Sequence, residues 1–145
     1  MDMSEQQKLL TELPGKLSVE LSNIMYSQKL EGIQYFSGKK PSFIATVAPL
    51  LKPVKVSKGE YIYLKGDAID GIYFIKQGEA AYVLENSEAD LVFAKKEEGS
   101  LFGDIDFIHT SSDSRRQFSV KAMADMDLLF FQRNDLFHLD LDFKQ

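Results

Sequence analysis

Turn-forming residues recur at short, nearly even intervals through residues 54–131 and divide this stretch into segments rich in β-branched and aromatic residues. This feature restricts the possible folds more than any other in the sequence. Six β-rich segments lie between the turns, at 61–64, 72–75, 80–84, 91–94, 118–122 and 128–131. Many short strands at such spacing are typical of a sandwich, a roll or a barrel. The sequence therefore predicts a mainly β unit over residues 53–132.

Helical patterns flank the β-rich unit on both sides. In residues 1–52, apolar residues recur at the spacing of one helical face. Pro14 suits the start of a first helix, and Pro41 suits the start of a second. Residues 133–145 are expected to begin a C-terminal helical region, with Asn134 as a cap.

Composition excludes several classes of function. The chain of 145 residues has a net charge of -5 and no basic stripe, so duplex nucleic acid is a poor candidate partner. Cysteine is absent, which excludes disulfides and thiolate metal sites. No apolar run approaches the length of a membrane-spanning helix, so a membrane role would need segments outside this sequence.

One interruption of the β pattern, between residues 102 and 118, carries the candidate chemistry. Gly103 would let the backbone approach a ligand closely. A helical turn over 104–108 would present free N–H groups and partial positive charge to a phosphate. Arg116 would add a charge-assisted contact to that phosphate, and Asp104 would suit a neighbouring hydroxyl such as a ribose 2′-OH. The alternative is an ordinary surface loop with solvated arginines.

The ordered glycine motifs give the stretch 54–131 a resemblance to the cyclic nucleotide-binding domain family. The motifs that carry it are Gly59-Glu60-Tyr61-Ile62, Gly66-Asp67, the run from Ile72 to Gly78, the run from Gly99 to Ile105, and the run from Arg116 to Ala122. The resemblance implies an eight-stranded β-roll, a double-stranded β-helix of the jelly-roll type, with flanking N-terminal helices. It also implies a phosphate-binding cassette between the sixth and seventh strands.

The resemblance assigns ligand contacts by position. Arg116 matches the arginine that holds the cyclic phosphate, and Asp104 matches the acid that holds the ribose 2′-OH. The other implied ligand-binding residues are Phe102, Gly103, Ile105 and the Gln117 amide in the cassette, with Phe74 and Val92 as the apolar wall near the base. The implied regulatory ligand is cAMP or cGMP, and no cofactor or metal is expected.

Three departures from the family pattern bear on ligand binding. The ribose position holds Asp104 rather than the usual Glu, and Gln117 replaces a small residue after the arginine. The interval from Asp104 to Arg116 is also a few residues longer than the family's. The sequence stops at Gln145 after a possible first C-terminal helix, so the family's lid helix is expected to be missing and cAMP to be poorly distinguished from cGMP.

The N-terminal region is similar to the linker helices of nucleotide-gated and ether-a-go-go-like potassium channels. The similarity is carried by Leu13-Pro14-Gly15-Lys16-Leu17, Met25-Tyr26, Leu30, Gly32-Ile33 and Phe36. It implies a cytoplasmic domain of a membrane channel, with the pore segments as effector and a homotetramer in the full-length protein. A helical lead-in like that of kinase regulatory subunits or transcription factors is the alternative.

Three functions follow from these patterns. The first is a sensor that binds cAMP or cGMP and passes occupancy to an attached effector. The second is a ligand-free homologue that serves as an assembly or gating module. The third, a metal-dependent enzyme on a related β-roll, would need clustered histidine and carboxylate ligands, and the chain has only His109 and His138. The chain is therefore expected not to be an enzyme.

Overall fold

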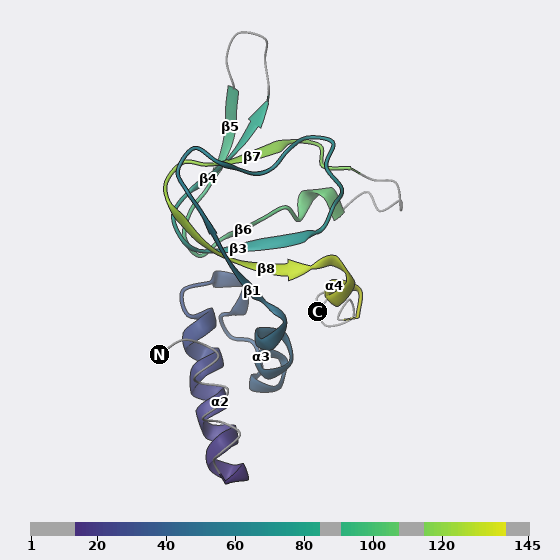
Figure 1. The fold of residues 1–145 in the computed structure, drawn as a ribbon. Helices are drawn as coiled ribbons and strands as arrows, with labels where there is room; N and C mark the ends of the chain where they lie inside the picture. The colour runs from purple at the N-terminus through teal and green to yellow at the C-terminus, as the bar shows by residue number, and fades with distance from the viewer. Residues whose placement is uncertain (1–13, 85–90, 108–114, 139–145) are drawn as a thin grey trace.

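Eight antiparallel strands in two four-stranded sheets form the roll of the computed structural model, which describes residues 14–84, 91–107 and 115–138 (Figure 1). One sheet has the order β1-β8-β3-β6, and the other has the order β2-β7-β4-β5. The strands are β1 (Lys52–Val56), β2 (Tyr61–Tyr63), β3 (Gly71–Gln77), β4 (Ala80–Leu84), β5 (Leu91–Lys96), β6 (Leu101–Phe102), β7 (Ser119–Ala122) and β8 (Met126–Gln132). The mainly β, eight-stranded roll is therefore confirmed.

Helices cover one side and one end of the roll. Those on the N-terminal side are α2 (Gly15–Leu30), η1 (Gln34–Phe36), α3 (Pro41–Val47) and η2 (Ala48–Leu50), while η3 (Ile105–Phe107) and α4 (Arg133–His138) come later in the chain. Pro14 directly precedes α2, and α3 begins at Pro41, as predicted. A proline ring already holds the φ angle that the first helical turn requires. No helix in the described ranges is long and apolar enough to cross a membrane.

Strand β3 contributes to two separate hydrophobic cores. Ile72 and Phe74 face the helices, where they pack in a cluster with Phe36 and Leu51. Tyr73 and Ile75 instead belong to a second cluster inside the roll. Side chains alternate between the two faces of a strand, so a strand with both faces covered is buried along most of its length. The first five residues of β3 are accordingly all buried.

Two lysines bind backbone carbonyls of the helical region, Lys29 from within α2 and Lys76 from β3. The Lys29 Nζ donates hydrogen bonds to the carbonyl oxygens of Ala48 and Leu51, each at 2.7 Å. The pairing of β3 with β8 shifts register between Ile75 and Gln77, which makes Lys76 the extra residue of a bulge. From this bulge the Lys76 Nζ reaches the C-terminus of α2 and donates to the Glu31 carbonyl at 2.7 Å.

Replacing Lys29 by methionine should lower the free energy of unfolding by about 1–3 kcal/mol, because two part-buried carbonyls lose their donor. Burial lowers the pKa of Lys29, so methionine also removes a desolvation cost, and the expected effect lies toward the small end of that range. Urea denaturation followed by circular dichroism measures the change. The control is Lys16→Met on an exposed turn of the same helix, which should stay within about 0.5 kcal/mol of the parent. Equal midpoints for the two variants would contradict the role of Lys29.

Candidate functional site

The backbone of Arg116 is fixed beside the turn that follows β2. Its N–H donates to the Asp67 carbonyl at 2.9 Å, and its own carbonyl accepts from the Gly66 N–H at 2.8 Å. The neighbouring Arg115 forms an isolated bridge with Ala68. This pairing directs the Arg116 side chain into the roll, where it is fully buried, while Arg115 is exposed.

The Arg116 guanidinium donates four hydrogen bonds inside the roll. Nη1 bonds to the Gly103 carbonyl at 2.8 Å and to Asp106 Oδ2 at 3.0 Å. Nη2 bonds to Asp70 Oδ1 at 2.8 Å and to the Gly71 carbonyl at 2.6 Å. The guanidinium carbon also lies 4.0 Å from the centre of the Tyr63 ring, a cation–π distance. Only Nε, itself buried, has no acceptor among the described residues.

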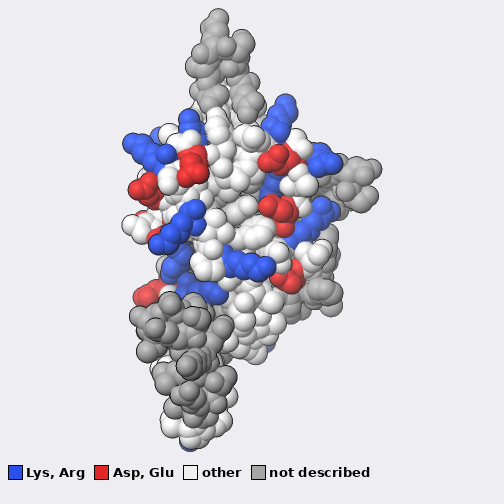
Figure 2. All heavy atoms as spheres, viewed as in Figure 1, with Lys and Arg blue, Asp and Glu red and all other residues white. Residues whose placement is uncertain are grey.

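Charge at the site is unbalanced in favour of the acids. Desolvation lowers the pKa of Arg116, but the hydrogen bonds that it donates to Asp70 and Asp106 raise it, and the net shift is upward. The guanidinium therefore remains protonated and carries one positive charge beside two carboxylates. Desolvation also raises the pKa of Tyr63, which keeps the ring under the guanidinium neutral. On the face shown in Figure 2, basic and acidic side chains are interspersed over the roll.

Asp106 occupies the centre of the site from the short helix η3. Its side chain is 2% exposed. While Oδ2 accepts from Arg116, Oδ1 accepts from the backbone N–H of Gln117 at 3.0 Å. The carboxylate thus binds the guanidinium and the amide that the family resemblance assigns to the cyclic phosphate. Asp106 was not among the residues predicted from the sequence.

Gly103 lies against the guanidinium, with its carbonyl oxygen 2.8 Å from Arg116 Nη1. Its φ of +89° is unfavourable for other residues, and a Cβ added there would lie 3.0 Å from Arg116 Nη1. Its N–H donates to the Tyr82 hydroxyl at 3.0 Å. The predicted closeness of Gly103 and Arg116 is present, but the group of Gly103 that faces the guanidinium is the carbonyl, not the N–H.

The remaining predicted residues differ in how deeply they are buried. Phe102 is fully buried and stacks on Tyr73 with ring centres 5.1 Å apart, and Ile105 packs against the interior cluster. Asp104 is exposed, as is the Gln117 side chain. Val92 on β5 is 39% exposed.

Phe74 does not fit the predicted wall near the base. It is fully buried in the cluster that faces the helices, and its ring centre lies 4.9 Å from that of Phe36. Phe74 lies in a strand, as predicted, but on the face of β3 that packs against the helices rather than on the face inside the roll. Tyr73, one residue earlier, faces the roll interior.

Asp70 and Tyr63 are two further members of the site that sequence reasoning missed. Asp70 lies 46 residues from Arg116 in the chain, and nothing local marks it as a partner. Asp106 left a clearer signal, because a second acid two residues after Asp104 is unexpected in a cassette that binds an anion.

The metal-enzyme hypothesis depends on the two histidines of the chain. His109 lies outside the described residues, and His138 is described only as the last residue of α4. Among the described side chains, no group of three or more His, Asp or Glu is arranged to hold a metal ion.

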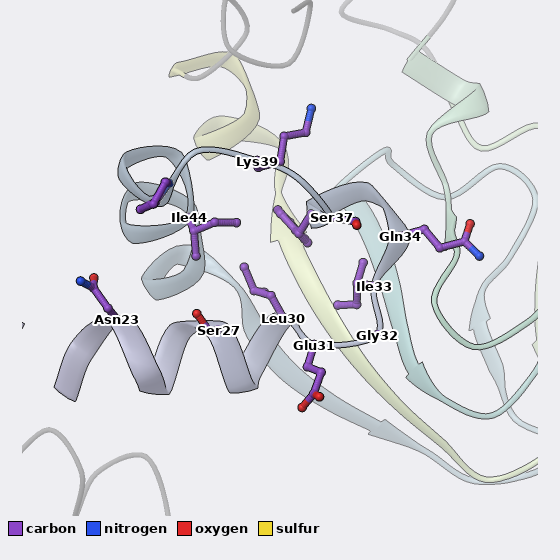
Figure 3. A pocket seen from close by; sticks show the side chains of 12 residues that line it. Asn23, Ser27, Leu30, Glu31, Gly32, Ile33, Gln34, Ser37, Lys39 and Ile44 are labelled. Atoms are coloured by element: carbon purple, nitrogen blue, oxygen red, sulfur yellow. The ribbon is translucent and has the colours of Figure 1, made fainter. Parts of the chain in front are cut away.

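A hollow of about 590 Å³ lies on the helical side of the molecule, away from Arg116 (Figure 3). Leu30, Ile33 and Ile44 point into it from α2, the segment before η1, and α3, whereas Lys39 points away. The Lys39 Nζ lies 4.7 Å from the centre of the Tyr35 ring. Leu30, Ile33 and Ile44 supply none of the polar contacts that a nucleotide phosphate requires.

Solved structures of known proteins share this fold. A regulatory subunit of a cAMP-independent protein kinase A from Trypanosoma brucei aligns over 85% of this chain and 45% of its own, with a TM-score of 0.70 and 19% identity. A mutant of the same protein bound to cAMP in the A site aligns with a TM-score of 0.68 over 82% of this chain and 43% of its own, also at 19% identity. The half-site-occupied form of the EAL enzyme Bd1971 aligns at 0.54 with 25% identity, over 62% of this chain and 79% of its own.

Among curated proteins, the chain is similar to cyclic nucleotide-gated channels. It is 27% identical to the alpha polypeptide of the cone photoreceptor channel of Gallus gallus over 135 residues, which cover 91% of this chain and 18% of the channel. It is 25% identical to a cyclic nucleotide-gated cation channel of Drosophila melanogaster over 144 residues, which cover 97% of this chain and 21% of the channel. The chain therefore spans about a fifth of the length of these relatives.

A family model described as "Cyclic nucleotide-binding domain" matches residues 53–140. The match begins one residue after the start of β1, and it contains every other strand and the whole Arg116 site. Because it covers more than half of the sequence and agrees with the eight-stranded roll, this chain belongs to the cyclic nucleotide-binding domain family.

Proposed function

We propose that this chain is a regulatory, non-catalytic domain that binds cAMP or cGMP at the Arg116 site and passes its occupancy to an attached effector. The observation that carries the proposal is the buried guanidinium, fixed by the Gly103 and Gly71 carbonyls inside the roll. A planar guanidinium in a desolvated site is a strong and specific partner for a phosphate. Membership of the family supports a 3′,5′-cyclic nucleotide as the source of that phosphate.

The proposed route to the effector runs along β3. The Gly71 carbonyl at one end of this strand contacts Arg116, and Phe74 packs among the N-terminal helices. Lys76, at the other end, binds the C-terminus of α2. A ligand that moves Arg116 would shift the balance between two positions of β3 and hence of the helices.

An ion channel is the effector that we propose. The support is the similarity to cyclic nucleotide-gated channels, which extends through the helical region of the chain. The full-length protein would then be a homotetramer with this domain on the cytoplasmic side of the membrane. We further propose that the channel selects potassium. A kinase or another effector is the alternative, because the structural neighbours include a regulatory protein of a kinase.

A second candidate function is that of a ligand-free assembly or gating module. The observation that favours it is the Asp106 carboxylate, which already binds both Arg116 and the Gln117 amide. A domain of this kind would stabilise one arrangement of its effector without responding to nucleotide.

Calorimetric titration of the folded chain with cAMP and with cGMP distinguishes the two functions. We expect saturable binding at a stoichiometry of one, and no comparable binding of 5′-AMP, which has an acyclic phosphate with a different shape and charge. If no binding occurs up to millimolar nucleotide, the sensor proposal is wrong for the isolated chain and the ligand-free module is favoured.

A further inference from the structure

The Asp106 carboxylate has the contacts of a bound anion. Each of its two oxygens accepts from a different donor, Oδ2 from the Arg116 guanidinium and Oδ1 from the Gln117 N–H, both at 3.0 Å. The side chain is 2% exposed, and the guanidinium is completely buried. A ligand phosphate from solvent therefore has no open contact with Arg116 while Asp106 remains in place.

Asp106 is not needed to hold the guanidinium in position. Nη2 is bound by Asp70 Oδ1 and by the Gly71 carbonyl, at 2.8 and 2.6 Å, and Nη1 also binds the Gly103 carbonyl at 2.8 Å. The contact with Gln117 moreover has no part in orienting Arg116. Asp106 thus supplies a second carboxylate to a cation that Asp70 already neutralises.

We propose that Asp106 is an internal ligand of the phosphate position, which a cyclic nucleotide must displace before it can bind Arg116. This inference rests on the proposed function and adds to it a residue that sets the affinity for nucleotide. One guanidinium between two carboxylates leaves the site with a net charge of −1. A cyclic phosphate that joined them would be repelled by Asp106 at short range in a buried, poorly screened site. Exchange of the carboxylate for the phosphate sets a threshold, so that only high nucleotide concentrations switch the domain.

The test compares two isosteric variants that each remove one carboxylate from the same guanidinium. In Asp106→Asn we expect cAMP or cGMP to bind at least about tenfold more tightly than in the parent, as measured by calorimetry, or about 1.4 kcal/mol. Asp70→Asn is the matched control, because Asp70 does not contact the Gln117 amide and its side chain is 54% exposed. Because Asp106 still occupies Nη1 and the Gln117 amide in this variant, any gain in affinity should be much smaller than in Asp106→Asn. Asp106→Ala repeats the measurement should the asparagine variant fold poorly.

Amide NMR spectra provide a second readout. The Gln117 amide proton should shift in Asp106→Asn as it loses its carboxylate acceptor, and shift again when cAMP is added. An unchanged or weaker affinity in both Asp106 variants, with the parent still binding nucleotide, overturns the internal-ligand inference and leaves the sensor proposal standing. Folded parent and variant chains that all fail to bind nucleotide overturn the sensor proposal itself.

Discussion

Replacing Arg116 by leucine is expected to lower the free energy of unfolding by about 3–5 kcal/mol. The reason is that Asp106 is 2% exposed and would remain as a buried carboxylate without its cation. The Gly103 and Gly71 carbonyls would each lose a donor as well. Urea denaturation followed by circular dichroism measures the loss, and nucleotide binding should disappear with it.

A double-mutant cycle separates the ion pair from simple loss of packing. In the combined variant Arg116→Leu with Asp106→Leu, no unpaired charge remains buried, so the cost should be smaller than the sum of the two single costs. Arg115→Leu, at the exposed neighbouring position, is the control and should change stability by about 0.5 kcal/mol or less. An Arg116→Leu chain as stable as this control would show that the buried pair contributes little.

Replacing Gly71 by alanine is the second large expected effect, a loss of about 3 kcal/mol or more from the free energy of unfolding. An added Cβ would overlap the Phe131 carbonyl and lie 2.7 Å from Cε1 of the Phe130 ring, so β8 would have to move away from β3. If β3 moved instead, its Gly71 carbonyl would be drawn away from Arg116 Nη2.

Gly15→Ala is the matched control for Gly71→Ala, because a Cβ at Gly15 meets no atom within 4 Å. It lies in α2, where alanine favours the helix, so this variant should be as stable as the parent or slightly more stable. Similar urea midpoints for the two variants would mean that β8 adjusts at little cost.

The roll was predictable because its strands and turns are encoded locally. The 80–84 segment coincides with β4, and the 72–75 segment lies inside β3. Two strands were missed for physical reasons. In β1, Lys52, Pro53 and Lys55 give an exposed edge without an apolar pattern, and β6 contains only two residues. A periodicity argument needs several residues on one face.

The centre of the site was only partly predictable. The convergence of Arg116 and Gly103 follows from the order of the cassette residues, and the structure places the two in contact. The roles of Asp70 and Asp106 depend on tertiary contacts that pair charges across the roll. Acidic side chains in polar loops are ordinarily exposed to solvent, and they are buried only when a cation pairs with them. The sequence does not show that pairing.

The bulge at Lys76 has a consequence for how such domains can be attached to other proteins. Its ammonium group binds the main chain at Glu31, and this contact does not depend on which side chain that position carries. A contact that binds only the main chain at the end of a helix tolerates almost any upstream sequence, provided that the helix ends at the same position. The same roll can therefore be joined to unrelated proteins during evolution, because β3 itself supplies the contact with the preceding helix.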